Sequence, residues 1–146
     1  MSYNYKYPRP MLTVDALIFN KNRNDLFILL IKRNNPPFKN MWALPGGFVD
    51  MDEDLINAVE RECFEETGLR LKGFRQLEAY GKPERDPRGR NIAIAHYIVL
   101  NEKLEPIAGD DAKDARWFLV NDLPELAFDH DEIIVDGIKK VQTSCT

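Results

Sequence analysis

The chain has 146 residues, of which 44% are hydrophobic and 30% charged, and its formal net charge at pH 7 is −4. This size and balance predict one globular domain over 1–146, and the acidic charge argues against broad nucleic-acid binding, which needs a basic face. No apolar run is long enough to span a membrane, no apolar signal core opens the chain, and only two cysteines are present, so we expect a cytoplasmic protein with reduced thiols.

The first half of the chain is predicted to contain strands and then a helix. Residues 1–10 are rich in Tyr and Pro and are expected to form an extended N-terminal arm. Strands are predicted over 12–19 and 26–31, and a proline-containing loop follows over 34–40. The next segment, 42–49, contains LPGG, which predicts a sharp turn.

A helix is predicted from about Asp54 to Thr67, because this segment contains good helix formers and neither Gly nor Pro. Asp52 or Asp54 is suited to cap its start, and Gly68 stands where a glycine commonly ends a helix.

The second half of the chain is predicted to return to strands and to finish on a helix. Strands are expected over 71–80, 91–100 and 115–120. A final helix is expected from about Asp129 to Val141, with Asp129 and Glu132 as a capping box. The order of elements predicts an α/β fold in which helices cover both faces of a mixed sheet.

Acidic residues of the first helix lie where apolar ones are expected. Leu55, Val59 and Cys63 form an apolar stripe, and Glu62 and Glu66 lie in or beside the same sector with Glu65 flanking them. Carboxylates beside a buried stripe are costly unless they are paired, and a divalent cation is a suitable partner. Several oxygen ligands favour Mg²⁺ or Mn²⁺. The alternative is an acidic face held by salt bridges, such as one between Arg61 and Glu65.

The run from Gly47 to Leu69 has the pattern G-x5-E-x7-R-E-U-x-E-E-x-G-U, where U is a bulky apolar residue. In this pattern the sequence resembles the Nudix hydrolases, and the resemblance extends over nearly the whole chain. It implies the Nudix fold, an α/β/α sandwich around a mixed β-sheet. The one departure is Cys63, where Leu or Val is usual, and cysteine can serve there as a small hydrophobic residue.

The resemblance also implies roles for individual residues. Glu62 and Glu66 match the main metal-binding glutamates, and the backbone carbonyl of Gly46 often adds a ligand in such proteins. The remaining motif residues are implied to act around the metal: Glu65 as an accessory ligand or catalytic group, and Glu53 with Arg61 as the pair that orients the glutamates.

A basic loop with the sequence GKPERDPRGR lies between two predicted strands. Its arginines Arg85, Arg88 and Arg90 are candidates for a phosphate clamp, since arginine binds phosphate in a bidentate manner. Solvated surface charge is the alternative. The phrases YGKPERDPRGR, GDDAKDARWF and AFDHDEII resemble the small ADP-ribose pyrophosphatase branch of the family.

Polar residues outside the motif are further candidates for the site. Asp111 is the first candidate, and Asp110 the second, for the extra carboxylate that many Nudix enzymes use as a base or metal ligand. His130 is expected to be a surface or capping residue, with a group that titrates near neutral pH and touches substrate as the alternative. His96 is expected to be a hydrogen-bonded core residue.

These residues and the resemblance predict metal-assisted hydrolysis of a nucleoside diphosphate linked to another group, with ADP-ribose as the expected substrate and AMP and ribose 5-phosphate as products. The alternatives are a nucleoside triphosphate pyrophosphatase, including one that acts on oxidised nucleotides, and a non-catalytic module that senses ADP-ribose. We expect no appended DNA-binding domain and no membrane partner. A homodimer is plausible because the branch often pairs and the aromatic arm is suited to mediate contact.

Overall fold

The computed structural model describes residues 2–109 and 111–144, and its elements follow the predicted order closely. The strand expected over 71–80 begins only at Arg75, because Gly73 has a φ of 99°, which lies outside the strand region. The elements in chain order are β1 (Met11–Asn22), β2 (Asp25–Arg33), β3 (Trp42–Ala43), β4 (Gly46–Phe48), α1 (Leu55–Thr67), β5 (Arg75–Tyr80), β6 (Asn91–Leu100), β7 (Ala112–Leu119) and α2 (His130–Ser144).

The strands form one mixed sheet with the path β3-β2-β1-β6-β5, while β4 also pairs with β1 and β7 with β2. Strand β1 is the centre of this sheet. It pairs in parallel with β6 from Met11 opposite Asn91 to Asn20 opposite Leu100. It pairs antiparallel with both β2 and β4. Since β1 is covered on both faces, its middle is continuously apolar rather than alternating, apart from Asp15.

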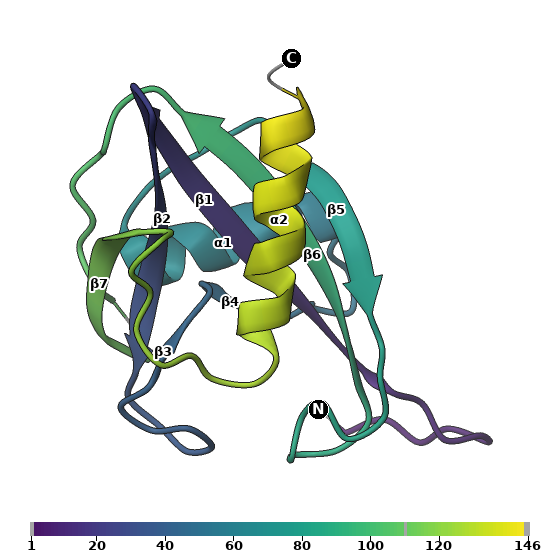
Figure 1. Cartoon of the computed structure of the whole chain (residues 1–146). Helices are drawn as coiled ribbons and strands as arrows, with labels where there is room; N and C mark the ends of the chain where they lie inside the picture. Colours follow the sequence, from purple (N-terminus) through teal and green to yellow (C-terminus); the bar gives the residue numbers. More distant parts are fainter. Residues whose placement is uncertain (1, 110, 145–146) are drawn as a thin grey trace.

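Two hydrophobic cores lie on opposite faces of the sheet. Successive β1 residues point to opposite sides, so Val14 and Ile18 pack on the α1 face while Leu17 and Phe19 pack on the α2 face. Figure 1 shows α1 behind the sheet and α2 in front of it. The predicted α/β/α sandwich is therefore confirmed.

Helix α1 has a defined cap at each end, as its sequence predicts. The carboxylate of Asp54 accepts a hydrogen bond from the N–H of Leu55 at 2.6 Å. Gly68 adopts a left-handed φ of 74° and donates its N–H to the carbonyl of Phe64 at 2.9 Å. These caps fix the length of the helix and hence the positions of its glutamates.

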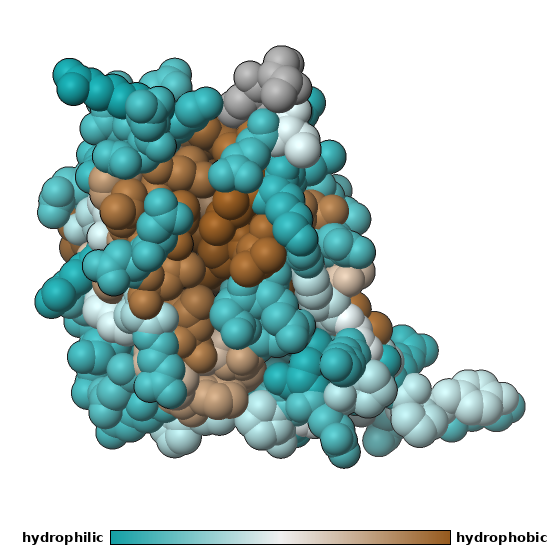
Figure 2. Space-filling model, in the orientation of Figure 1, coloured by the Kyte–Doolittle hydropathy of each residue, from teal (hydrophilic) through white to brown (hydrophobic). Residues whose placement is uncertain are grey.

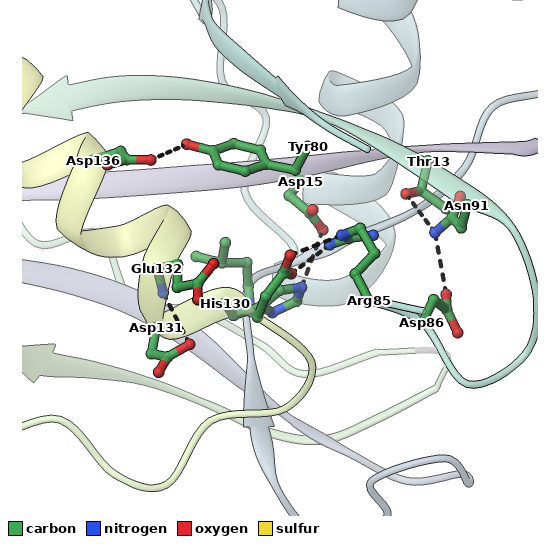
Figure 3. A network of polar contacts seen from close by, with 12 residues as sticks. Thr13, Asp15, Tyr80, Arg85, Asp86, Asn91, His130, Asp131, Glu132 and Asp136 are labelled. Atoms are coloured by element: carbon green, nitrogen blue, oxygen red, sulfur yellow. Dashed lines mark hydrogen bonds and ion pairs between the residues drawn. The ribbon is translucent and has the colours of Figure 1, made fainter. Parts of the chain in front are cut away.

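Helix α2 approaches the sheet closely at Gly137. A Cβ atom at this position would lie 2.4 Å from Leu17 Cδ2, so a larger residue would require the Leu17 side chain to move. The predicted capping box is wrong, because the Asp129 carboxylate accepts two hydrogen bonds from Arg85 instead. At the helix start, the Asp131 carboxylate accepts from the N–H of Glu132 at 2.9 Å, as Figure 3 shows.

The surface on the α2 side is partly apolar. Figure 2 shows hydrophobic side chains gathered beside α2 and a pale arm that projects from the lower right of the body. In this arm Tyr3, Tyr5 and Tyr7 are all exposed. Neither helix of the described part of the chain is long and apolar enough to cross a membrane.

Candidate active site

Two glycines allow α1 to approach the turn that contains them. The N–H of Gly46 donates to Glu66 Oε2 at 2.8 Å. The carboxylate of Glu62 lies against Gly47, where a Cβ atom would be only 2.6 Å from its carboxyl carbon. A Cβ atom at Gly46 would lie 2.2 Å from the carbonyl oxygen of Val14 on β1. The two glycines of the LPGG turn therefore permit these close contacts, which bring the carboxylates of Glu62 and Glu66 together beside the turn.

The two carboxylates are partly removed from water. Burial raises the pKa of Glu66 to about 8, with the nearby charge of Glu62 adding to this and the Gly46 N–H opposing it. Burial also raises the pKa of Glu62, while Arg61 acts in the opposite direction. A nearby cation would favour the charged form of both groups.

Arg61 connects four groups around these carboxylates. Its Nε and Nη2 donate to the two oxygens of Glu53 at 2.7 and 2.8 Å. Its Nη1 donates to Glu62 at 2.8 Å and to Glu65 at 3.1 Å, and Nη2 also donates to the carbonyl of Phe48 at 3.0 Å. The salt bridge between Arg61 and Glu65 is thus present, but it is one part of a network that also holds Glu62.

A cleft of about 350 Å³ opens beside this network. Carboxylates line it together with arginines, so charges of both signs face one space. The acidic residues are Asp50, Glu62, Glu66 and Asp111, and the basic residues are Arg33, Arg61 and Arg88.

Asp111 reaches the cleft because the preceding loop is fixed to the end of α1. The N–H of Ile107 donates to the carbonyl of the last α1 residue at 2.7 Å, and the N–H of Gly109 donates to that of the residue before it at 3.4 Å. The Asp111 carboxylate then accepts from the side-chain amide of Asn35 at 3.2 Å. The second candidate, Asp110, lies outside the described residues.

The three arginines predicted to form a phosphate clamp occupy different environments. Arg88 lines the cleft, and its guanidinium lies 5.1 Å from the Phe48 ring centroid while pairing with Asp86 at 2.8 Å. Arg90 donates to a backbone carbonyl at 2.6 Å and does not line the cleft.

Arg85 lies deeper than the other two arginines. Only 4% of its side chain is exposed, and it donates to both oxygens of Asp129 at 2.8 and 2.6 Å. The backbone is left-handed on either side of this pair, with a φ of 68° at Glu84 and 54° at Phe128. These features indicate that Arg85 holds the loop to the start of α2.

Arg33 and Phe128 also line the site, and the sequence analysis missed them. Arg33 ends β2, and its Nε donates to the carbonyl of Pro37 at 2.8 Å. Its guanidinium lies 5.1 Å from the Phe128 ring centroid. Burial lowers the pKa of Arg33, and nearby Arg88 adds to this effect. The available signal was a basic residue at the end of a buried strand, directly before a loop.

A smaller, polar pocket of about 70 Å³ adjoins the cleft behind Gly46 and Phe48. The expectation of a surface or capping role for His130 is wrong, because His130 is 5% exposed and lines this pocket. Its Nδ1 accepts from the N–H of Leu44 at 3.0 Å, and its Nε2 lies 3.7 Å from Asp15 Oδ1. Burial lowers the pKa of His130 to about 3, so the ring is neutral. Figure 3 shows His130 and Asp15 facing Arg85.

Cys63 and His96 have structural environments, as predicted. Cys63 is fully buried, and burial raises the pKa of its thiol to about 11, so it is no nucleophile at neutral pH. His96 is 3% exposed, and its Nδ1 lies 3.2 Å from the carbonyl of Ile94.

The donor set suits a hard cation. Glu62 and Glu66 supply carboxylate oxygens, and Gly46 lies directly beside them. Within residues 2–109 and 111–144, no three His, Cys, Asp or Glu side chains already form a compact metal-binding group. Mg²⁺ retains several waters and needs only one or two carboxylates, so this pair is compatible with it.

Comparison with known proteins agrees with this geometry. The family profile of the NUDIX domain matches residues 9–136. The ADP-ribose pyrophosphatase of Methanocaldococcus jannaschii is 50% identical over 134 residues, which are 91% of this chain and 76% of that protein.

Two further proteins are also similar. The ADPR responsive transcriptional repressor NtrR of Acinetobacter baylyi is 36% identical over 92% of this chain, which spans 56% of that protein. The crystallised NUDIX domain of Shewanella oneidensis NrtR, complexed with ADP ribose, has a TM-score of 0.87 and 32% identity over 95% of this chain and 94% of that one.

Proposed function

Because this chain belongs to the Nudix family, we propose that it is a metal-dependent pyrophosphohydrolase that cleaves ADP-ribose to AMP and ribose 5-phosphate. One observation carries the proposal: the two half-buried motif carboxylates face a cleft lined by arginines, in a chain 50% identical over 134 residues to an ADP-ribose pyrophosphatase. The bound relative, an ADP-ribose complex of the same fold, supports the same substrate.

Glu62, Glu66 and the carbonyl of Gly46 would hold Mg²⁺ or Mn²⁺. The fit rests on two half-buried carboxylates that meet at the Gly46–Gly47 turn, and burial raises the pKa of both, so a cation beside them would favour their charged forms. When bound, the cation neutralises diphosphate charge and acidifies the attacking water. The chain itself contributes Arg61, which fixes Glu62 by a hydrogen bond of 2.8 Å and is in turn fixed by Glu53.

The arginines of the cleft would bind the diphosphate from the other side. Arg33 and Arg88 both line the cleft and the smaller pocket, so they lie at the junction of the two. Arg88 is 35% exposed and can rearrange, whereas Arg33 is anchored by the carbonyl of Pro37. We assign Arg88 to substrate binding and place Arg33 beside it as a second phosphate-facing cation.

Glu65 and Asp111 are the two candidates for the group that takes a proton from the attacking water. Glu65 is 38% exposed and bound to Arg61 at 3.1 Å. Asp111 lies across the cleft and is held by Asn35 at 3.2 Å. Replacing each by its amide and comparing turnover at saturating metal distinguishes them, because loss of the base lowers kcat even when the metal site is filled.

The proposed activity is tested by incubating the protein with ADP-ribose and MgCl₂ and separating the products by anion-exchange chromatography. AMP and ribose 5-phosphate should form, and EDTA should abolish them. Parallel reactions with dGTP and 8-oxo-dGTP test the triphosphate alternative, and preference for either would replace ADP-ribose as the assigned substrate.

A sensing function is the second candidate, because a repressor described as ADPR responsive is 36% identical to this chain. The complete set of Glu53, Arg61, Glu62, Glu65 and Glu66 favours hydrolysis. Calorimetric titration with ADP-ribose in Mg²⁺ separates the two functions. Tight binding with unchanged ligand after hours of incubation would establish sensing instead of turnover.

We also propose that two copies associate through the N-terminal arm. Tyr3, Tyr5 and Tyr7 are 51%, 42% and 68% exposed, which is unusual for three aromatic residues so close together. Light scattering of the full chain and of a variant with these three residues changed to Ser tests this. A dimer that becomes monomeric supports the proposal, and a monomeric full chain rejects it.

A further inference from the structure

The small pocket beside the cleft contains a hydrogen-bond acceptor that has no donor. Asp15 lines this pocket and is 6% exposed, and among the described residues no group donates a hydrogen bond to its carboxylate. Asn91 also lines the pocket, but its Oδ1 is buried from solvent, and its Nδ2 donates to the Asp86 carboxylate at 3.1 Å and to Thr13 Oγ1 at 3.2 Å.

The donors around the pocket are mostly engaged. Arg85 donates to Asp129, and Arg88 donates to Asp86, in both cases through two nitrogens. His130 is the donor side chain that reaches Asp15. Its Nδ1 accepts from Leu44, so the neutral ring carries its proton on Nε2, which faces Asp15 across 3.7 Å. One hydroxyl placed beside this gap can accept from the imidazole and donate to the carboxylate.

The small pocket selects single hydroxyl groups over a purine base. The fused rings of a purine fill more space than the few water-sized groups that the pocket admits, whereas one hydroxyl can contact both His130 and Asp15. A sugar hydroxyl both donates and accepts. The volume of about 70 Å³ has room for several water-sized groups, which suits hydroxyls entering from the cleft.

The pocket also lies where a sugar would be. It shares Gly46, Gly47 and Phe48 with the cleft, together with Arg33 and Arg88. A sugar is attached directly to each end of the diphosphate in ADP-ribose. A diphosphate bound at the carboxylates would therefore bring one ribose to the mouth of the pocket.

On the basis of the proposed function, we propose that Asp15 and His130 form a ribose-recognition site that binds a hydroxyl of one sugar of the substrate. Asp15 is its specificity-determining residue, because it is the acceptor to which no described group donates a hydrogen bond. Buried oxygen atoms without partners do occur elsewhere in the chain, as at Asn20 Oδ1, but Asn20 lines neither the pocket nor the cleft.

Substrate analogues test the proposal and identify which ribose is bound. The wild-type enzyme is assayed with ADP-ribose, with the analogue lacking the 2-hydroxyl of the adenosine ribose, and with the analogue lacking that of the terminal ribose. We expect one analogue to lose at least about tenfold in kcat/KM, since a site built for a hydroxyl rejects its absence. Equal use of all three substrates would overturn the proposal.

The Asp15→Asn variant then shows whether this residue makes the distinction. It should lose activity on ADP-ribose and treat ADP-ribose and the disfavoured analogue alike, within about twofold. A retained tenfold preference would overturn the role of Asp15. Asn20→Ala is the matched control, a buried polar residue of the same strand that should leave the preference intact. Should Asp15→Asn not fold, the wild-type comparison still decides.

Failure of this inference can be separated from failure of the proposed function. If the wild-type enzyme does not hydrolyse ADP-ribose at all, the proposed function fails. The pocket is then tested by calorimetric titration with ADP-ribose and both analogues, which requires no turnover. Equal affinities for the three would overturn the ribose site, and weaker binding of one analogue would support it.

Discussion

The guanidinium of Arg61 donates from Nε and Nη2 to the two carboxylate oxygens of Glu53, at 2.7 and 2.8 Å, and this leaves Nη1 to hold Glu62 at 2.8 Å. The two hydrogen bonds to Glu53 fix the plane of the guanidinium, so Glu53 controls the position of Glu62 through Arg61. We therefore regard Arg61 as a positioning residue.

Arg61→Lys should lower kcat by about ten- to hundredfold, because lysine cannot hold Glu53 and Glu62 at once. Stability should change by less than about 1 kcal/mol, since the network is partly exposed. Steady-state kinetics and thermal unfolding measure the two effects. Lys72→Ala, which removes an exposed salt bridge to Glu60 on the same helix, is the control and should retain full activity.

Glu62→Gln and Glu66→Gln should each lower kcat by about a hundredfold or more, because an amide binds a divalent cation far less well than a carboxylate. The fold should survive, since glutamine at position 66 can still accept from the N–H of Gly46. Turnover is measured over a titration of Mg²⁺ and circular dichroism confirms folding. Full activity in either folded variant would remove that residue from the metal site.

Substitutions at the adjacent Gly46 and Gly47 should have different effects on stability and turnover. Gly46→Ala places a methyl group against the backbone of Val14, so we expect a loss of about 2 kcal/mol in unfolding free energy. Gly47→Ala instead displaces the side chain of Glu62, so we expect turnover to fall by about a hundredfold with a smaller loss of stability. Thermal unfolding and kinetics on both variants give the comparison. Similar effects of the two changes would argue against the assigned contacts.

Arg85 and Arg88 form a second pair for comparison. Arg88→Ala should mainly raise KM for ADP-ribose, because it removes binding present before the reaction begins. Arg85→Ala should mainly destabilise the protein, by about 3 kcal/mol, because it leaves Asp129 without its buried partner. Urea unfolding and KM measurements on both variants test the distinction. An unchanged KM in Arg88→Ala would exclude Arg88 from substrate binding.

Metal-free protein should become less stable as pH rises. The pKa of Glu66 is about 8 in the folded state against an ordinary 4.5, so the folded protein keeps a proton that the unfolded chain releases. This stabilisation is fully present below pH 4.5 and is lost as the pH rises to about 8. Melting temperatures in EDTA should fall most clearly between about pH 6.5 and 8, because below pH 6.5 the lowered pKa of His130 contributes stability that increases with pH and opposes the effect of Glu66. Mg²⁺ should raise them more at pH 8 than at pH 6.

The control for this pH dependence is Glu66→Gln in EDTA. Its slope should be shallower, but a slope should remain because burial also raises the pKa of Asp15, to about 7. An identical slope in the variant and the wild type would contradict the assignment to Glu66.

Local features made α1 and its glutamates predictable. Three features act within this one helix and can therefore be inferred from the sequence: the Asp54 cap, the Gly68 terminus and the i, i+4 spacing of Glu62 and Glu66. The NUDIX match and the mixed sheet confirm the family and the fold inferred from that segment.

Contacts between distant residues were not predictable in this way. The prediction of a surface position for His130 was wrong because its ring is held in the interior by a hydrogen bond from the N–H of Leu44, 86 positions earlier. The predicted cap at Asp129 failed because Arg85, 44 positions away, competes for the same carboxylate. Such contacts require the register of the sheet, and a single sequence does not specify that register.

The parallel pairing of β1 with β6 has a consequence for biosynthesis. The paired residues stand 80 positions apart, as do Asn20 and Leu100, which also share a hydrogen bond. Closing so long a loop is entropically costly and delays the pairing. A nascent chain on the ribosome therefore cannot complete the pocket between Asp15 and Asn91 until β6 has emerged, and His130 at the start of α2 follows later still. Recovery of substrate selectivity therefore reports on assembly of nearly the whole fold.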